Sequence, residues 1–210
     1  ENAPAVLYGW FNGSEAGRAM ADVLFGDVNP SGKLPFTLPG QLVDVGAHAL
    51  NAYPGENGIV QYNEGLFVGY RWFDSKHIDP IYPFGHGLSY AQFDYSKFKT
   101  DQRVYQPGDR IKMSFKIRNS GTIPGKESAQ CYVRAEDTSM LRPPKELKAF
   151  TKIQLDAGQE KTVSLYLNVD NLACFDESQE CWIVEPGLYT LMIGSSSRDI
   201  REQITVSVSK

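Results

Sequence analysis

A carboxylate and an aromatic ring lie close together near the start of this sequence, where binding or chemistry could occur. Glu15 follows the loop of residues 10–14, between an expected strand and an expected helix. Ligands of α/β domains usually bind at that edge of the sheet, and Trp10 offers a flat apolar face to a ring-shaped ligand such as a sugar. Both residues are candidates for substrate binding. The simpler interpretation, which we prefer, is that Glu15 caps its own helix and that Trp10 is buried at a domain interface.

Four polar residues lie in an aromatic-rich stretch further along the chain. Glu64, Arg71 and Asp74 could touch a substrate at a domain junction, but we expect ion pairs or capping contacts that fix this stretch. His86 stands between two glycines and could act as a base. Because no nucleophile lies near it in sequence, we expect a glycine-rich turn with one polar anchor.

The cysteines raise the question of a disulfide or a metal site. Cys174 and Cys181 are separated by a mostly polar stretch between two strand-like runs. A hairpin there would bring the two sulfurs together, so a disulfide is expected in an oxidising compartment, with two free thiols as the alternative. Cys131 lies in an alternating strand and is expected to be a buried thiol. The three cysteines and three histidines lack zinc-site spacing, so neither a metal nor a cofactor is expected.

The bulk properties exclude several classes of partner. The 210 residues are 41% hydrophobic and 22% charged, with a formal net charge of -4. Binding to nucleic acid or to an anionic membrane requires concentrated positive charge, which is not seen here. No apolar run reaches the roughly 20 residues that a membrane-spanning helix needs.

Residues 1–40 have the pattern of part of an α/β domain. An apolar run at residues 5–8 predicts a buried strand. Asn12 and Glu15 have capping-box spacing at the start of a helix, and Gly26 is placed to end that helix. An apolar stripe at helical spacing is formed by Ala16, Met20, Val23 and Leu24. Residues 33–38 then alternate, and Pro35 within them predicts an edge strand.

The pattern changes twice along the rest of the chain. Residues 41–88 have weak periodicity but many aromatic side chains, which predicts a connector packed over neighbouring domains. From residue 89 to residue 210, apolar and polar residues alternate in short runs separated by turn signals. About seven such strands predict a β-sandwich of the immunoglobulin or fibronectin III type, with Trp182 in its core. The expected fold class is therefore mainly β, preceded by an incomplete α/β segment.

One helix and about two strands are too few to enclose a core of their own. Leaving the apolar residues of this segment in water would forfeit roughly 1.5–3 kcal/mol for each large side chain. We therefore expect residues 1–88 to dock onto further protein outside these 210 residues.

Three stretches resemble glycoside hydrolase family 3. Residues 13–37 read GSEAGRAMADVLFGDVNPSGKLPFT, which is similar to the end of that family's α/β-sandwich domain. Residues 62–74 (YNEGLFVGYRWFD) and 81–90 (IYPFGHGLSY) resemble the connector into its third domain. The fibronectin III-like domain of the family is matched by RPPKELKAF, WIVEPGLY and IGSSS, which begin at residues 142, 182 and 193.

The resemblance implies a retaining, exo-acting β-glucosidase, which uses a nucleophile and an acid/base carboxyl group about 5–5.5 Å apart. In the family the nucleophile lies in an amino-terminal barrel, and the acid/base lies in the α/β domain before the stretch found here. No catalytic residue is therefore assigned, and this chain alone is expected to be inactive. The expected partner is the amino-terminal part of the same enzyme, through which a β-glucoside is bound.

Three further expectations stay open. The fibronectin-like domain could instead be a module that binds carbohydrate or protein, because sandwich folds host many functions. A β-xyloside or another β-glycoside could replace the β-glucoside as substrate. A periplasmic or secreted location is expected from the resemblance and from the possible disulfide.

Overall fold

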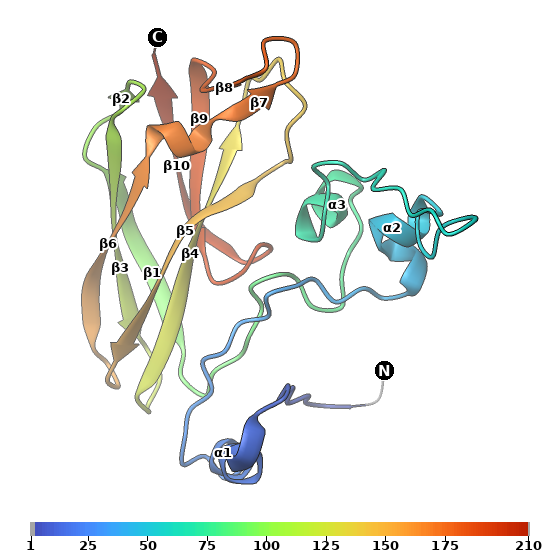
Figure 1. Cartoon of the computed structure of the whole chain (residues 1–210). Helices are drawn as coiled ribbons and strands as arrows, with labels where there is room; N and C mark the ends of the chain where they lie inside the picture. Colours follow the sequence, from blue (N-terminus) through green and yellow to red (C-terminus); the bar gives the residue numbers. More distant parts are fainter. Residues whose placement is uncertain (1–2, 210) are drawn as a thin grey trace.

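The protein is described by a computed structural model over residues 3–209. Its larger part is a sandwich of two antiparallel sheets, with one short parallel edge pairing (Figure 1). The three-stranded sheet has the order β1 (Phe93–Thr100), β3 (Arg110–Asn119), β6 (Glu160–Asn168). The five-stranded sheet has the order β2 (Val104–Tyr105), β10 (Ile200–Val208), β9 (Gly187–Gly194), β4 (Gly125–Ala135), β5 (Glu146–Leu155). The predicted mainly β fold with a fibronectin-like sandwich is confirmed.

The alternation in the sequence explains the core of this sandwich. Ile111, Met113 and Phe115 on β3 are buried and lie opposite buried residues of β6. On the other sheet, Cys131 of β4 pairs with Ile193 of β9, and both are fully buried. Because side chains of a strand alternate between its two faces, each strand gives one row to the core and one to solvent.

A small hairpin outside the two sheets corrects one expectation. The strands β7 (Cys174–Asp176) and β8 (Cys181–Ile183) pair only with each other, after the 3-10 turn of Val169–Leu172. Trp182 therefore does not fill the core: it is 72% exposed and contacts the edge of Phe175. The indole cannot reach the core because its strand belongs to neither sheet of the sandwich.

In the described residues before the sandwich, the regular elements are short helices. They are a 3-10 turn at Gly13–Glu15, α1 (Ala16–Leu24), a second 3-10 turn at Leu42–Asp44, α2 (Gly46–Ala49) and α3 (Tyr70–Ser75). Figure 1 shows α1 below the sandwich and α2 and α3 beside it. One extended stretch leads from α1 to α2, a second leads from α3 to the sandwich, and the two run alongside each other. No helix within residues 3–209 is long and apolar enough to span a membrane.

Both strands predicted in this segment are wrong as regular strands. Residues 5–8 are extended but unpaired with any other described stretch. In residues 33–38, Leu34 and Leu38 exchange backbone hydrogen bonds with residues 81–86, yet only the bridge between Leu38 and Tyr82 forms. A strand requires a neighbouring ladder, and residues 3–209 provide no further strand beside either stretch.

The start of α1 also differs from the expected capping box. Asn12 has φ -80° and ψ 1°, and neither it nor Glu15 makes a side-chain capping bond. A capping side chain needs the extended backbone of a true N-cap residue. The 3-10 turn in front of α1 leaves Asn12 outside that conformation. Gly26, with φ +87°, ends the helix as predicted.

Candidate functional site

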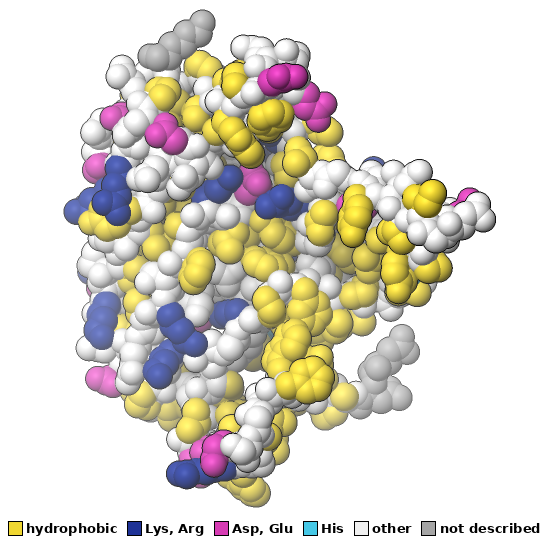
Figure 2. All heavy atoms as spheres, viewed as in Figure 1, with side chains coloured by type: hydrophobic (Ala, Val, Ile, Leu, Met, Phe, Trp, Pro, Cys, Tyr) yellow, Lys and Arg dark blue, Asp and Glu magenta, His cyan; other side chains and the backbone are white. Residues whose placement is uncertain are grey.

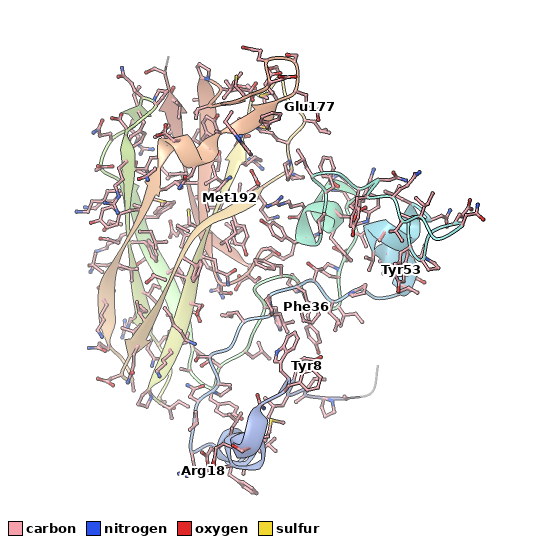
Figure 3. All side chains as sticks on the ribbon, in the orientation of Figure 1. Tyr8, Arg18, Phe36, Tyr53, Glu177 and Met192 are labelled. Carbon is pink, nitrogen blue, oxygen red and sulfur yellow. The ribbon has the colours of Figure 1, made fainter. Side chains whose placement is uncertain are left out.

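Trp10 and Glu15, the two candidate binding residues, lie at the start of the chain and are exposed. Trp10 is 54% exposed and has edge-on ring contacts with Tyr8 and Phe36, at centroid distances of 4.6 and 5.5 Å. Figure 3 shows Tyr8 and Phe36 close together above α1. The structure thus assembles an open aromatic cluster around Trp10, whereas Glu15 makes no capping bond.

An apolar surface covers much of the segment before the sandwich. Most of the exposed large hydrophobic side chains belong to residues 3–88, and α1 contains no buried residue. Phe11, Phe25 and Tyr62 are each more than four-fifths exposed. Figure 2 shows hydrophobic side chains gathered over this part of the molecule. Exposed apolar side chains gathered in this way are typical of a surface that meets another protein.

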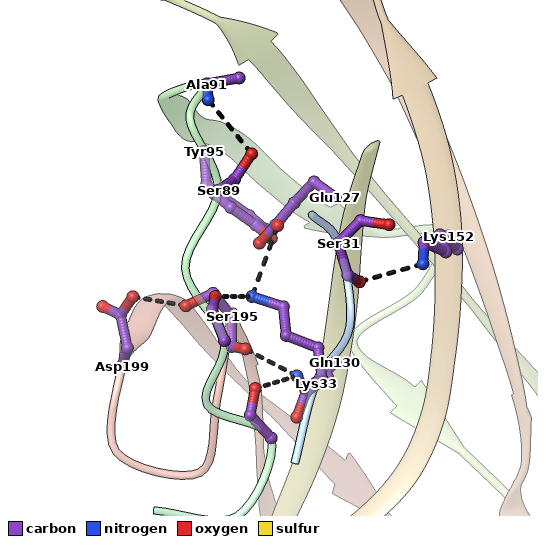
Figure 4. A network of polar contacts seen from close by, with 12 residues as sticks. Ser31, Lys33, Ser89, Ala91, Tyr95, Glu127, Gln130, Lys152, Ser195 and Asp199 are labelled. Atoms are coloured by element: carbon purple, nitrogen blue, oxygen red, sulfur yellow. Dashed lines mark hydrogen bonds and ion pairs between the residues drawn. The ribbon is translucent and has the colours of Figure 1, made fainter. Parts of the chain in front are cut away.

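Lys33 and Glu127 fix the segment to the sandwich through a buried polar contact (Figure 4). The Lys33 ammonium lies 3.5 Å from the Glu127 carboxylate and donates to the Gly87 carbonyl at 3.0 Å. Glu127 is only 4% exposed and accepts a 2.8 Å hydrogen bond from the Tyr95 hydroxyl. Burial, together with the negative charge of Glu127, raises the pKa of Tyr95 well above its usual range. Tyr95 therefore remains a hydrogen-bond donor over the whole neutral range.

Gln130 is the second buried polar anchor at the same junction. Its side-chain amide donates to the carbonyls of Gly85 and Ser195, at 3.2 and 2.6 Å. Its carbonyl accepts from the Tyr132 hydroxyl at 2.5 Å. Gly85 has φ +79°, and a Cβ atom there would lie 2.1 Å from Gln130. Sequence reasoning missed Gln130 because its one signal, a buried-strand position held by an amide, has no partner nearby in sequence.

Asp74 anchors α3 to the sandwich. Its carboxylate is almost fully buried and lies 2.6 Å from the Lys145 ammonium and 2.7 Å from the Arg198 guanidinium. Arg71 is paired with Glu146 at 3.4 Å. The expected structural role is confirmed for Asp74 and Arg71, which both form ion pairs with the sandwich. The same expectation is wrong for Glu64, whose Oε2 atom has no hydrogen-bond partner within residues 3–209.

His86 forms part of the turn at the junction, as expected. Its ring stacks on Tyr82 at 5.1 Å, and it lines a polar hollow of about 390 Å³ with Lys33 and Asp199. Burial, and then the charge of Lys33, lower the pKa of His86, while Asp199 opposes the shift. The folded protein therefore favours the neutral imidazole.

The lowered pKa of His86 predicts a measurable pH dependence. The unfolded histidine takes up a proton below about pH 6.5, whereas the folded one resists it, so stability should fall as the pH drops through this value. We expect His86→Gln to weaken this loss in urea unfolding measured at pH 7 and pH 5.5. His77→Asn, at an exposed histidine of the same segment, should keep the parent behaviour. An unchanged slope in His86→Gln would contradict the assignment.

The expected disulfide does not form. Cys174 lies opposite Ile183 and Cys181 lies opposite Asp176, so the two cysteines are diagonal neighbours on the hairpin. Diagonal pairs are about 7–8 Å apart, beyond the usual Cα separation of a disulfide. Both are free thiols, as is the buried Cys131, whose pKa burial raises to about 12.

Known proteins are similar to this chain along nearly its whole length. The family model described as "Glycosyl hydrolase family 3 C-terminal domain" matches residues 1–90, and the one described as "Fibronectin type III-like domain" matches residues 127–197. Beta-glucosidase BoGH3A of Bacteroides ovatus is 43% identical over 96% of this chain, and Thermostable beta-glucosidase B of Acetivibrio thermocellus is 44% identical over all of it. The solved structure of beta-glucosidase 3B from Thermotoga neapolitana in complex with glucose matches 93% of the chain at 40% identity, with a TM-score of 0.86.

The chain corresponds to only part of each of these relatives. It spans 27% of the length of each of the three proteins. Two family models in the expected order, together with the fold of the solved relative, agree with the motifs at residues 13–37, 62–90 and 142–197. The chain therefore belongs to glycoside hydrolase family 3 and corresponds to the carboxy-terminal region of the family's members.

Proposed function

We propose that this chain is the carboxy-terminal portion of a retaining, exo-acting β-glucosidase and that it supports the catalytic domains without supplying a catalytic residue. Two relatives that carry the name beta-glucosidase match nearly all of the chain and are about 27% covered by it. The remaining length would hold the nucleophile and the acid/base residue. The chain's task is then to keep their two carboxyl groups at the separation that retaining chemistry requires.

The single observation that carries this proposal is the unequal exposure of apolar side chains. The sandwich encloses a complete core of its own, whereas the segment before it leaves most of its large apolar side chains in water. Residues 5–8 also make no backbone hydrogen bond to the rest of residues 3–209. Unpaired backbone and bare apolar side chains favour docking of another sheet and its covering layer, which the amino-terminal part would supply.

Reconstitution from two pieces tests the proposal. This chain and the amino-terminal part of the same polypeptide would be produced separately and together, and hydrolysis of an aryl β-glucoside would be compared with that of the intact enzyme. We expect no activity from this chain alone, little from the amino-terminal part alone, and recovery when the two are produced together. An aryl β-xyloside assayed in parallel checks the choice of sugar. Activity in this chain alone, or full activity in the amino-terminal part alone, would refute the supporting role.

The alternative of a binding module has less support. The feature in its favour is the exposed pair of Phe175 and Trp182 on the β7–β8 hairpin. The two rings meet edge to face at an interplanar angle of 67°, so they form no flat platform for a sugar. The periplasmic or secreted location stays a prediction.

A further inference from the structure

The polar hollow beside His86 lies where the segment before the sandwich meets the sandwich, and its volume is about 390 Å³. The segment lines it with Lys33 and residues 86–89, and the sandwich contributes Glu127 and the stretch that contains Ser195 and Asp199 (Figure 4). Sites for small molecules usually occupy about 300–1,000 Å³ and combine a few converging polar groups with apolar ones. The hollow is therefore large enough for a small ligand of one or two rings.

The charged side chains of the hollow are already paired with each other. The Lys33 ammonium lies 3.5 Å from the Glu127 carboxylate. Arg201 donates twice to Asp199, at 2.7 and 2.8 Å. An anionic ligand would have to displace a carboxylate from its partner, and a cationic one would find only Asp94, an exposed carboxylate whose charge is screened by water. The hollow therefore favours a neutral ligand.

Three side chains of the hollow keep hydrogen-bonding groups for such a ligand. Arg201 uses Nε and Nη2 on Asp199, which leaves Nη1 without a partner within residues 3–209. The neutral His86 ring stacks on Tyr82 and offers one donor and one acceptor at its edge. The exposed side-chain amide of Gln92 makes no hydrogen bond within residues 3–209 and offers both kinds of group. Because a hydroxyl group also donates and accepts, a ligand rich in hydroxyls can match all three side chains.

We propose that this hollow binds a neutral, hydroxyl-rich ligand, either a free monosaccharide or a terminal sugar unit of an oligosaccharide. Its hydroxyls would meet His86, Gln92 and Arg201, and the C–H groups of the sugar ring would pack on Leu88, which is 77% exposed at the hollow. Because the hollow is lined from both sides, the bound sugar would hold the segment against the sandwich. The proposed supporting role requires no sugar at this junction, so the two proposals stand or fall separately.

Hydrogen exchange in the complete polypeptide, with glucose as the probe, tests the site. The Ser197 amide donates to the Phe84 carbonyl across the junction at 2.9 Å and reports on its opening. A sugar that binds only the closed junction should slow this exchange in proportion to its concentration, by about tenfold at ten times its Kd. Maltotriose, whose α-linkages a β-glucosidase leaves intact, distinguishes the two sources of the sugar. Protection by glucose indicates a site for free sugar, and protection by maltotriose alone indicates a site for a sugar unit of a chain.

A pair of glutamine variants separates this hollow from any other sugar site. Gln92→Ala should raise the Kd for the protecting sugar about fivefold, the usual effect of one lost hydrogen bond. Gln154→Ala, at an exposed glutamine of β5 outside the hollow, is the matched control and should leave the Kd unchanged. Both variants should hydrolyse an aryl β-glucoside with the wild-type kcat and KM.

Several outcomes would overturn the sugar site. The absence of protection by glucose and by maltotriose would do so, as would an equal Kd in Gln92→Ala and Gln154→Ala. Equal protection by inorganic phosphate would also overturn it, because the hollow would then take an ion. A changed KM in Gln92→Ala would place the sugar at the catalytic centre instead. A wild-type polypeptide that does not hydrolyse the aryl β-glucoside would refute the proposed function, whatever the exchange shows.

Discussion

Asp74→Ala is expected to favour release of α3 from the sandwich by about 3–5 kcal/mol, the usual effect of removing one partner from a buried ion pair. The Asp74 side chain is 5% exposed and lies between Lys145 and Arg198. Without it, the Lys145 ammonium and the Arg198 guanidinium lose the buried carboxylate that lies between them. Arg198 would also lose the contact that orients it towards the carbonyl of Ile78, to which it donates at 3.0 Å.

Amide exchange distinguishes this local release from unfolding of the whole chain. The amides of Lys76 and Ile78 donate to the carbonyls of Trp72 and Phe73, both at 2.9 Å, and should become unprotected in Asp74→Ala. Amides of the sandwich strands should keep their protection, because their core does not include Asp74.

Two further variants separate charge from geometry. Asp74→Asn keeps the shape and should give an intermediate effect. Asp79 provides the control: it is paired with the same Arg198 at 3.4 Å, but its side chain is 96% exposed. Exposed pairs contribute about 0–1 kcal/mol, so Asp79→Ala should hardly change exchange. Equal effects of Asp74→Ala and Asp79→Ala would show that the burial of Asp74 is not what matters.

The sandwich could be predicted from sequence because its information is local. The alternation in β3, from Ile111 to Ile117, specifies which face is buried before any partner strand is known. The same reasoning failed for residues 5–8, whose apolar run is typical of a strand buried on both faces. A strand of that kind depends on neighbours, and residues 3–209 contain none for it.

The polar contacts between the preceding segment and the sandwich could not be predicted from sequence, because the information for them is not local. Lys33 and Glu127 lie far apart in sequence, as do Asp74 and Arg198, and no periodicity links them. Of the residues that form ion pairs with the sandwich, Asp74 and Arg71 were given a structural role in advance, but their partners were not. The cysteine pair shows the limit at short range: its spacing predicted the hairpin correctly, but the register of the two strands decides whether the two sulfurs meet.

Phe115→Ala is expected to cost about 3–5 kcal/mol of global stability, since a large buried aromatic side chain is lost and a cavity remains. Phe115 is 1% exposed at the centre of β3, opposite the buried Val163. Its ring lies 6.2 Å from the rings of both Tyr95 and Phe98. Replacement therefore removes the packing of three aromatic rings at once.

The effect should extend from the core to the junction with the preceding segment. Tyr95 packs on Phe115 with its ring, and its hydroxyl holds the Glu127 carboxylate that Lys33 meets. A looser Tyr95 ring should weaken that hydrogen bond. Urea unfolding of Phe115→Ala should therefore show the lower global stability, and hydrogen exchange should show lower protection of sandwich and junction amides together. Phe150→Ala, at a phenylalanine of β5 that is 70% exposed, should change stability by less than about 1 kcal/mol. If the junction amides kept their protection while the sandwich amides lost it, Tyr95 would not couple the two regions. A loss of protection in both would show that the segment before the sandwich depends on the sandwich core.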